Sequence, residues 1–439
     1  MKWVNWIPGL VAVALWTVFA PGIYSHDGNR YLYDALTGYY GDLSPVINLL
    51  YFSTIIKVWC DVGLITLGTC LFTMYGIWYL LRKLFTRGMA LCVLCVLLSP
   101  LTPLTMLLVS TCKDSWQLGA LGWATGCLVA LWRRQGYVST WFLVRASVAM
   151  ALAAMIRHNS VLLLPVFALS LCLARGWHRW FALAPSVIYL AATILIGYIV
   201  PVTREYSIRQ VQIMDVAGVC AIKPEAAKDF PEVMRNFAKD YPATFVNGRM
   251  DTLYTSNGWN KCNWNYIYAG TTNMNGVHAQ YLPSSPITRE YHNVFRHWPT
   301  LLLVKTQAFL NLYLLRGEPE IRIGRMYEQG VVSAYVTLSE NPSFAGTRKT
   351  LYAVWSAVLE KSSFRVLAYP PLWNVIGLVA LAVMFARRDP FGWVLLPLVA
   401  YVFTFAPASI LVSYRLLWPS ALLLPAALAA WALTVEESV

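Results

Sequence analysis

Long apolar segments alternate with short polar ones along most of this chain. A membrane-spanning helix needs roughly 20 mainly apolar residues, because it must cross a hydrocarbon core about 30 Å thick. Segments of this kind lie at 4–22, 61–81, 88–109, 115–132, 138–156, 160–175, 180–200, 371–386, 391–412 and 416–434. The pattern predicts an all-α polytopic membrane protein with about ten transmembrane helices.

The composition favours the same class. Of the 439 residues, 58% are hydrophobic and 13% are charged, whereas a soluble domain carries about 25% charged residues. The net charge of +13 would also suit a nucleic-acid partner. We expect no such partner, because the basic residues form short clusters between apolar segments rather than one stripe.

These basic clusters predict the topology. Alternate connections carry Arg82 and Lys83 with Arg87, Arg133 with Arg134, Arg175 with Arg179, and Arg387 with Arg388, and Lys2 lies on the same side. Cytoplasmic loops carry an excess of Lys and Arg, so this side is predicted to be cytoplasmic. The opposite side then receives residues 23–60, three short turns and the polar segment 201–370. We therefore divide the chain into an N-terminal transmembrane module (1–200), an extracytoplasmic insert (201–370) and C-terminal transmembrane helices (371–439).

The insert shows no strict helical or strand period between 243 and 282, which predicts a small mixed domain of loops with short strands or helices. Residues 298–315 are apolar but interrupted by polar side chains, which predicts an amphipathic interfacial helix. Two questions stay open here. The aromatic residues Trp259, Trp264, Tyr266 and Tyr268 suit either sugar binding or domain packing, and Cys220 and Cys262 are either a disulfide or two thiols.

The first extracytoplasmic loop concentrates acidic and basic side chains: His26, Asp27, Arg30, Asp34 and Asp42. If 28–37 is helical, Asp27, Tyr31 and Asp34 share one face. A carboxylate half removed from water at a membrane edge can act as a proton acceptor. We take Asp27 and Asp42 as candidate catalytic bases and His26 as a supporting hydrogen-bond partner, against the alternative that the acids only cap helices in a solvated loop.

Three more polar turns interrupt the extracytoplasmic ends of apolar segments. They contain Lys113 and Asp114, then Arg157, His158 and Asn159, and finally Tyr414 and Arg415. Cations at this depth suit a phosphate at headgroup level, and Lys305 in the predicted interfacial helix is a further candidate. For any single cation, snorkelling to water is the simpler explanation. Three such turns on the side of the acidic loop favour a shared substrate site.

This order of features resembles the GT-C glycosyltransferases, which use polyprenyl-phosphate sugars. The likeness rests on the acidic first loop, the Lys113–Asp114 turn, the turn with Arg157 and Asn159, the insert, and the Tyr414–Arg415 turn. It implies an aspartate base at Asp27 or Asp42 and basic residues on the lipid phosphate at Lys113, Arg157 and Arg415. Many members show two adjacent acids in this loop, whereas here His26 precedes Asp27 and Gly28 follows it. The departure leaves open which aspartate is the base and whether a divalent cation binds.

The resemblance also implies a location and partners. The enzyme would be a multi-pass protein of the bacterial inner membrane, with its active site facing the periplasm. The donor would be a polyprenyl-phosphate-linked sugar, and the acceptor a cell-surface glycan, a lipid or a protein such as pilin. No cofactor other than the undecided cation is expected.

Three other functions compete with this reading. A secondary transporter would also hold intramembrane charges, but no matching pair of interrupted segments recurs in two halves of the chain. A lipid-linked glycan flippase or polymerase would share the basic interior, and a non-catalytic assembly subunit would lose nothing when Asp27 and Asp42 are replaced. We therefore expect a glycosyltransferase and keep these alternatives for experiment.

Overall fold

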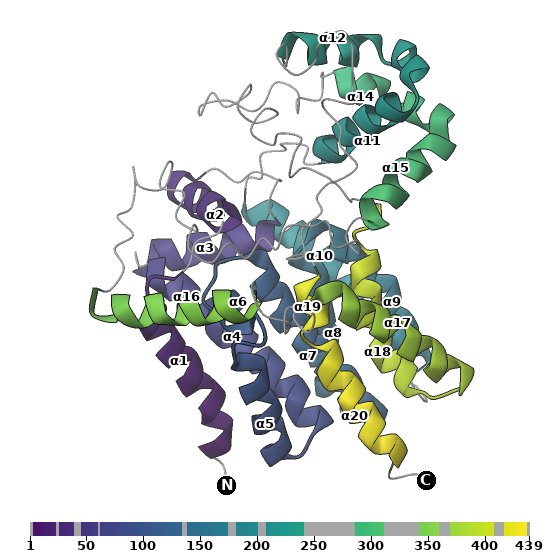
Figure 1. The fold of residues 1–439 in the computed structure, drawn as a ribbon. Helices are drawn as coiled ribbons and strands as arrows, with labels where there is room; N and C mark the ends of the chain where they lie inside the picture. Colours follow the sequence, from purple (N-terminus) through teal and green to yellow (C-terminus); the bar gives the residue numbers. More distant parts are fainter. Residues whose placement is uncertain are drawn as a thin grey trace.

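The computed structural model describes residues 3–22, 26–38, 45–59, 62–133, 138–173, 181–200, 208–240, 286–310, 342–359, 369–407 and 417–436. Within these ranges the regular structure is helical, and no strand is formed. The predicted all-α class is therefore confirmed for the described part of the chain (Figure 1).

The apolar segments form one bundle of helices. Its N-terminal part consists of η1 (Trp3–Trp6), α1 (Ile7–Phe19), α4 (Val62–Leu84), α5 (Arg87–Leu98), α6 (Leu104–Leu108), α7 (Lys113–Arg133), α8 (Thr140–Met155), η2 (His158–Leu162), α9 (Leu163–Leu173) and α10 (Ala184–Ile199). Its C-terminal part consists of α17 (Pro370–Ala386), α18 (Phe391–Phe403), α19 (Trp418–Ala421) and α20 (Leu424–Glu436). Both chain termini lie at one end of this bundle, and helices α11, α12, α14 and α15 lie beyond the other end (Figure 1).

Most apolar helices are shorter than the segments predicted from sequence. Among the described residues, Val62–Leu84 is the one helix whose length and composition both suffice to cross a membrane. Helix α7 has 21 residues, and the shorter apolar helices have 10–17. The expected helix at 88–109 is divided into α5 and α6 by a turn that contains Pro100 and Pro103. Proline lacks the backbone N–H that a continuous helix needs, so the helix ends there.

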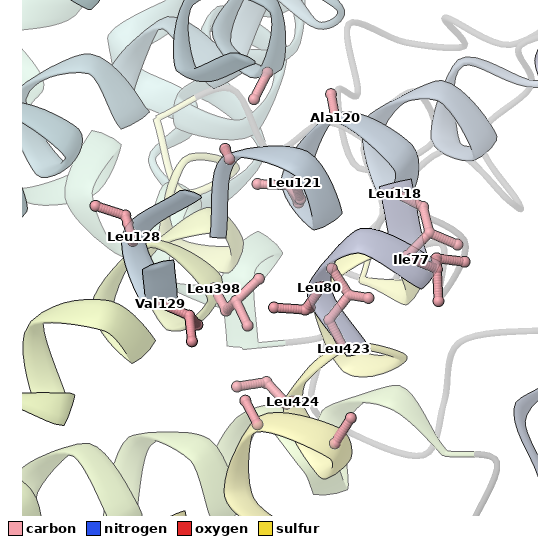
Figure 2. Close-up of a cluster of buried hydrophobic side chains, with 14 of the residues drawn as sticks. Ile77, Leu80, Leu118, Ala120, Leu121, Leu128, Val129, Leu398, Leu423 and Leu424 are labelled. Atoms are coloured by element: carbon pink, nitrogen blue, oxygen red, sulfur yellow. The ribbon is translucent and has the colours of Figure 1, made fainter. Parts of the chain in front are cut away.

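Helices α4 and α7 form the centre of the bundle and run parallel. A Cβ atom added at Gly76 would lie 2.2 Å from the carbonyl oxygen of Gly119, and one at Gly122 would lie 2.7 Å from that of Gly76. Only glycine permits this backbone approach. The Thr73 hydroxyl donates to the Ser115 carbonyl at 2.8 Å, and leucines of α4, α7, α18 and α20 pack around the pair (Figure 2).

Three helices near the other end of the bundle do not correspond to any of the predicted membrane-spanning segments. They are α2 (His26–Thr37), α3 (Val46–Trp59) and α16 (Ala345–Leu359), although α2 confirms the helix considered for 28–37. Tyr31 of α2 meets Phe52 of α3 edge-on, with ring centroids 5.4 Å apart. Helix α16 lies across the bundle (Figure 1), and its Arg348 donates to the Val18 carbonyl at 2.9 Å, which ties it to the end of α1.

The described part of the predicted insert builds a second hydrophobic core. It consists of α11 (Ile208–Ile222), η4 (Pro224–Asp229), α12 (Pro231–Asp240), α14 (Pro286–Glu290), η8 (Tyr291–His297) and α15 (Trp298–Leu310), and η10 (Pro342–Phe344) precedes α16. Val216, Val219 and Phe230 are buried in this core. Residues 243–282, for which a mixed domain was predicted, lie outside the described residues, as does Cys262; Cys220 is a buried thiol.

Helix α15 confirms the helix predicted over 298–315 as far as Leu310. Its Val304 belongs to the insert core, whereas its Phe309 lies 5.7 Å from the Phe403 ring of α18. Helix α15 therefore contacts the core of the insert and the core of the bundle.

Candidate functional site

Two breaks in the helical bundle bring polar residues into its interior. The chain between α6 and α7 is irregular over 109–112, and α8 ends at Met155, before the short 3-10 helix His158–Leu162. Irregular backbone frees N–H and C=O groups from regular helix pairing, so it is stable in an apolar interior only where other groups satisfy it. The polar side chains predicted from sequence at 113–114 and 157–159 lie at these two breaks.

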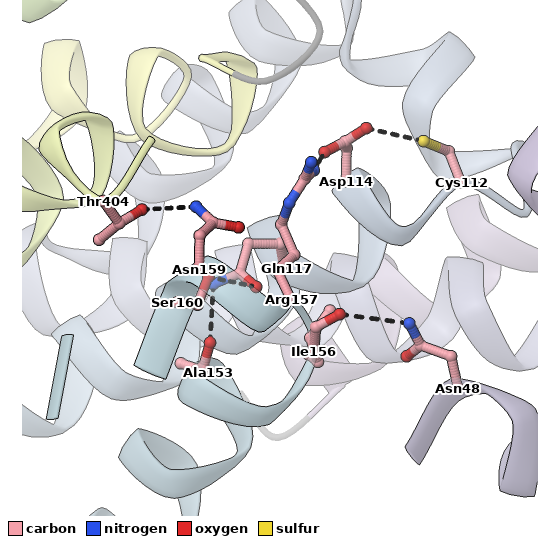
Figure 3. A network of polar contacts seen from close by, with 10 residues as sticks. All are labelled: Asn48, Cys112, Asp114, Gln117, Ala153, Ile156, Arg157, Asn159, Ser160 and Thr404. Carbon is pink, nitrogen blue, oxygen red and sulfur yellow. Dashed lines mark hydrogen bonds and ion pairs between the residues drawn. The ribbon is translucent and has the colours of Figure 1, made fainter. Parts of the chain in front are cut away.

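A buried ion pair connects the two breaks. The Arg157 guanidinium contacts the Asp114 carboxylate, and the two residues are only 6% and 0% exposed. The Cys112 thiol donates to the other oxygen of Asp114 at 2.8 Å (Figure 3). Charges this deeply buried need such partners, because removing either ion from water costs several kcal/mol.

The Arg157 side chain also has donors that the ion pair does not use. Its Cζ lies 5.2 Å from the centre of the Phe405 ring, a cation–π contact with the residue that follows Thr404. Its Nε is buried and has no hydrogen-bond partner within the described ranges. A buried guanidinium with an unused N–H is a suitable partner for an anionic oxygen.

Hydrogen bonds to other helices hold the non-helical segment that contains Arg157 in place. Asn159 donates to the Thr404 hydroxyl at 2.7 Å, and Asn48 of α3 donates to the Ile156 carbonyl at 3.3 Å. Gln117 of α7 donates to the Ala153 carbonyl at 2.9 Å and accepts from Ser160 at 3.5 Å. Figure 3 shows these contacts around Arg157. The network holds the non-helical backbone in one arrangement, which preorganises the ion pair.

Helix α2 brings the acidic first loop against this site. A Cβ atom added at Gly28 would lie 1.9 Å from the Thr111 hydroxyl and 2.9 Å from the Thr111 Cβ. The backbone of Asp27, one residue before Gly28, therefore lies beside the segment that leads into Cys112 and Asp114. The acidic loop and the Lys113–Asp114 turn, which are predicted from sequence to share a site, are therefore adjacent in their backbones at Gly28 and Thr111.

The other predicted residues of the first loop are placed only in part. Asp34 is 1% exposed on the same face as Tyr31, which agrees with the predicted helical face. His26, Asp27 and Arg30 belong to α2, but their side chains lie outside the description. Asp42 also lies outside the described residues.

The predicted cationic residues do not all converge on Arg157. Lys113 is partly exposed at the start of α7, and His158 is exposed beside Arg157. Tyr414 and Arg415 lie outside the described residues. Lys305 contacts Asp215 of α11 at 2.6 Å instead, and therefore its charge is already balanced within the insert.

The Lys305–Asp215 pair has a third member. The Tyr291 hydroxyl donates to Asp215 at 2.9 Å. Burial raises the pKa of the Asp215 carboxyl above its ordinary value, and the charge of Lys305 offsets part of this effect. The net rise indicates that removing the carboxylate from water changes the pKa of Asp215 more than its contacts with Lys305 and Tyr291 do.

Several residues of the site were missed from sequence. Cys112, Gln117, Ser160 and Thr404 carry contacts of the network (Figure 3). A usable signal was present for Gln117, because a buried glutamine inside an apolar helix requires hydrogen-bond partners. Cys112 carried no such signal, since cysteine is common in apolar segments.

The described residues contain no group of three or more His, Cys, Asp or Glu side chains that could hold a metal ion. They contain a buried guanidinium with one N–H that has no partner among the described residues, close to a helix that carries the Asp27 residue. No family model, no curated protein and no solved structure matches the chain.

Proposed function

We propose that the chain is an integral membrane glycosyltransferase of the GT-C kind. It would transfer a sugar from a polyprenyl phosphate to an acceptor hydroxyl on the extracytoplasmic side. One observation carries the proposal: α2, with Asp27, packs at Gly28 against the segment that leads to the buried Asp114–Arg157 pair. This packing supports a shared site for the proposed base and the proposed phosphate-binding cation.

Exposed apolar side chains support the membrane location. Val187, Leu190 and Ile194 of α10 are 63%, 59% and 51% exposed, and Val379 of α17 is 60% exposed. In water, an apolar surface of this extent would cause aggregation, whereas lipid chains would cover it. About ten spans remain our proposal for the whole chain, with shorter helices crossing at a break or continuing in their connections.

The distribution of charge supports the proposed orientation. Arg82 and Lys83 end α4, Arg87 begins α5, and Arg133 donates to the Leu84 carbonyl at 2.9 Å. The α4–α5 connection lies at the end of the bundle where both termini lie, opposite the insert (Figure 1). By the positive-inside rule this end is cytoplasmic, and the insert and α2 are then periplasmic.

The proposed chemistry is a single displacement at the anomeric carbon. The acceptor hydroxyl attacks, Asp27 or Asp42 takes its proton, and the C–O bond to the lipid phosphate breaks, so the anomeric centre is inverted. Negative charge grows on the departing phosphate, and Arg157 stabilises it without reorganisation because its position is already set. Asp114 keeps the guanidinium in place between turnovers.

Sugar transfer in proteoliposomes tests the proposal. Purified protein is supplied with polyprenyl-phosphate-linked glucose, arabinose or aminoarabinose and with glycan, lipid A or pilin acceptors, and the products are identified by mass spectrometry. We expect Asp27→Asn or Asp42→Asn to abolish transfer while the protein remains folded. Glu225→Gln, a change at an exposed position of the insert, is the matched control and should retain transfer. If neither aspartate variant loses activity, the proposed base is wrong.

Topology and transport give independent tests. Reporter fusions in 23–60 and 201–370 should both report the periplasm, and opposite faces would exclude a shared site. The buried ion pair also suits a secondary transporter, which would move a solute across sealed vesicles without forming a glycosidic bond. Solute uptake in the absence of any lipid-linked sugar would favour that alternative.

A further inference from the structure

A buried tyrosine faces the same site and has no assigned role. Tyr401 of α18 is 0% exposed, and its ring meets Phe405 at 90° with centroids 5.3 Å apart. Phe405 is the ring on which the Arg157 guanidinium lies. The two aromatic rings thus form a support for Arg157.

The Tyr401 hydroxyl is buried without a hydrogen-bond partner in the part of the chain that the structure describes. Its ring and the Arg157 guanidinium both contact the ring of Phe405. Leaving a buried hydroxyl without a partner lowers the stability of the fold, because the hydroxyl loses its hydrogen bonds to water. A fold optimised for packing alone would place phenylalanine here, since the ring contacts would be the same.

Unsatisfied polar atoms also occur elsewhere, for example at Thr125 and Ser170. The Tyr401 hydroxyl differs because a second unused donor, the Nε of Arg157, accompanies it. Both groups donate, and one of them is cationic. Two buried donors without an acceptor, on side chains that contact the same Phe405 ring, are complementary to an anionic oxygen supplied by a ligand.

We propose that the Tyr401 hydroxyl and the Arg157 guanidinium together bind one phosphoryl oxygen. The proposal rests on the proposed function for the identity of the ligand, a polyprenyl phosphate. In this arrangement Arg157 provides charge and Tyr401 provides a directed hydrogen bond, while Asp114 and Phe405 hold the guanidinium. Tyr401 is then a binding residue that touches the lipid phosphate and not a packing residue of α18.

Binding measured on the purified full chain tests this assignment. Wild type and Tyr401→Phe are titrated in detergent micelles with undecaprenyl phosphate, with undecaprenol and with inorganic phosphate. A hydrogen bond to a charged oxygen contributes about 1.5–3 kcal/mol, so Tyr401→Phe should weaken phosphate binding by about 10- to 100-fold. Undecaprenol affinity should not change, because that lipid lacks the phosphoryl oxygen.

Tyr51→Phe is the matched control, because it makes the same change at a tyrosine whose hydroxyl donates to the Ile65 carbonyl at 2.8 Å. This variant should lower the thermal midpoint and leave phosphate binding unchanged. Tyr401→Phe should leave the midpoint of the free protein unchanged or raise it, because the lost hydroxyl had no partner. If Tyr401→Phe lowers only phosphate binding and Tyr51→Phe lowers only the thermal midpoint, the Tyr401 hydroxyl acts in ligand binding and not in packing.

Each outcome is decisive. Loss of undecaprenyl phosphate binding in Tyr401→Phe supports the assignment, and an equal loss for inorganic phosphate supports it with free phosphate as the ligand. Unchanged phosphate binding in Tyr401→Phe, or no phosphate binding by wild type, overturns it. If sugar transfer occurs but is independent of Tyr401, the proposed function stands and this inference fails. If Tyr401-dependent binding occurs without any sugar transfer, the inference stands and the glycosyltransferase proposal fails.

Discussion

The buried ion pair between Asp114 and Arg157 can be tested by removing its charges singly and together. Arg157→Met keeps a long side chain over Phe405 but deletes the charge. Asp114→Leu deletes the carboxylate, and the double variant replaces both ions with apolar groups. Because the exposed fractions of Asp114 and Arg157 are 0% and 6%, neither remaining ion can recover its hydration in a single variant.

The expected loss of stability follows from this burial. Removing one partner of a buried pair typically costs about 3–5 kcal/mol. In Arg157→Met the carboxylate can also take up a proton, which costs an ordinary aspartate of pKa about 3.9 roughly 4 kcal/mol at pH 7. Because the carboxylate can be protonated at this cost, the loss of stability in Arg157→Met should not exceed about 4 kcal/mol at pH 7. This upper limit decreases by about 1.4 kcal/mol for each pH unit below pH 7. The double variant should recover most of the loss, because no unpaired charge remains buried.

The assay is the free energy of unfolding of the detergent-solubilised protein at pH 7 and pH 5. We expect both single variants to be destabilised and the double variant to approach wild type, with a strongly non-additive cycle. The deficit of Arg157→Met relative to wild type should shrink on acidification, since protonation of the abandoned carboxylate becomes easier. Additive losses, or a deficit that is the same at both pH values, would show that the two charges are not buried against each other.

Three further results are expected. Gly28→Ala should destabilise the protein by about 1–3 kcal/mol and reduce sugar transfer, because the added methyl group would lie 1.9 Å from the Thr111 hydroxyl. Gly88→Ala is the control, because a Cβ atom added there has no neighbour within 4 Å. This control should change neither thermal unfolding nor sugar transfer. Asp389→Ala should cost about 2 kcal/mol in unfolding experiments, because Asp389 accepts from the Phe391 backbone N–H at 2.8 Å and from an indole of α20 at 2.7 Å; an unchanged unfolding free energy would contradict both contacts. Because burial raises the pKa of Asp215, the folded chain binds this proton more tightly than the unfolded chain does, and stability should fall as the pH rises above about 4. Asp215→Asn should remove that slope, and a slope that persists in the variant would assign it to other groups.

The positions of many helices could be predicted from sequence, because the spacing of apolar residues and the length of an apolar segment depend on that segment alone. The segments at 61–81, 115–132, 138–156 and 371–386 all appear as helices within a few residues of the predicted ends. A helix over 28–37 was considered from sequence because it would bring Asp27, Tyr31 and Asp34 onto one face, and α2 contains this range. By contrast α3 and α16 were missed, since at 14 and 15 residues each is shorter than the length that was used to recognise a span.

The sequence by itself determined that the apolar segments are helical, that they are too numerous for one small core, and that acidic and basic residues collect at their ends. Only the tertiary structure decided which of these residues are partners. Arg157 pairs with Asp114 across 43 positions and Lys305 with Asp215 across 90, as their residue numbers show. Such pairings depend on how helices pack, and that packing is decided by close backbone approaches such as Gly76 against Gly119. No periodicity within a single segment records which distant segment will lie beside it.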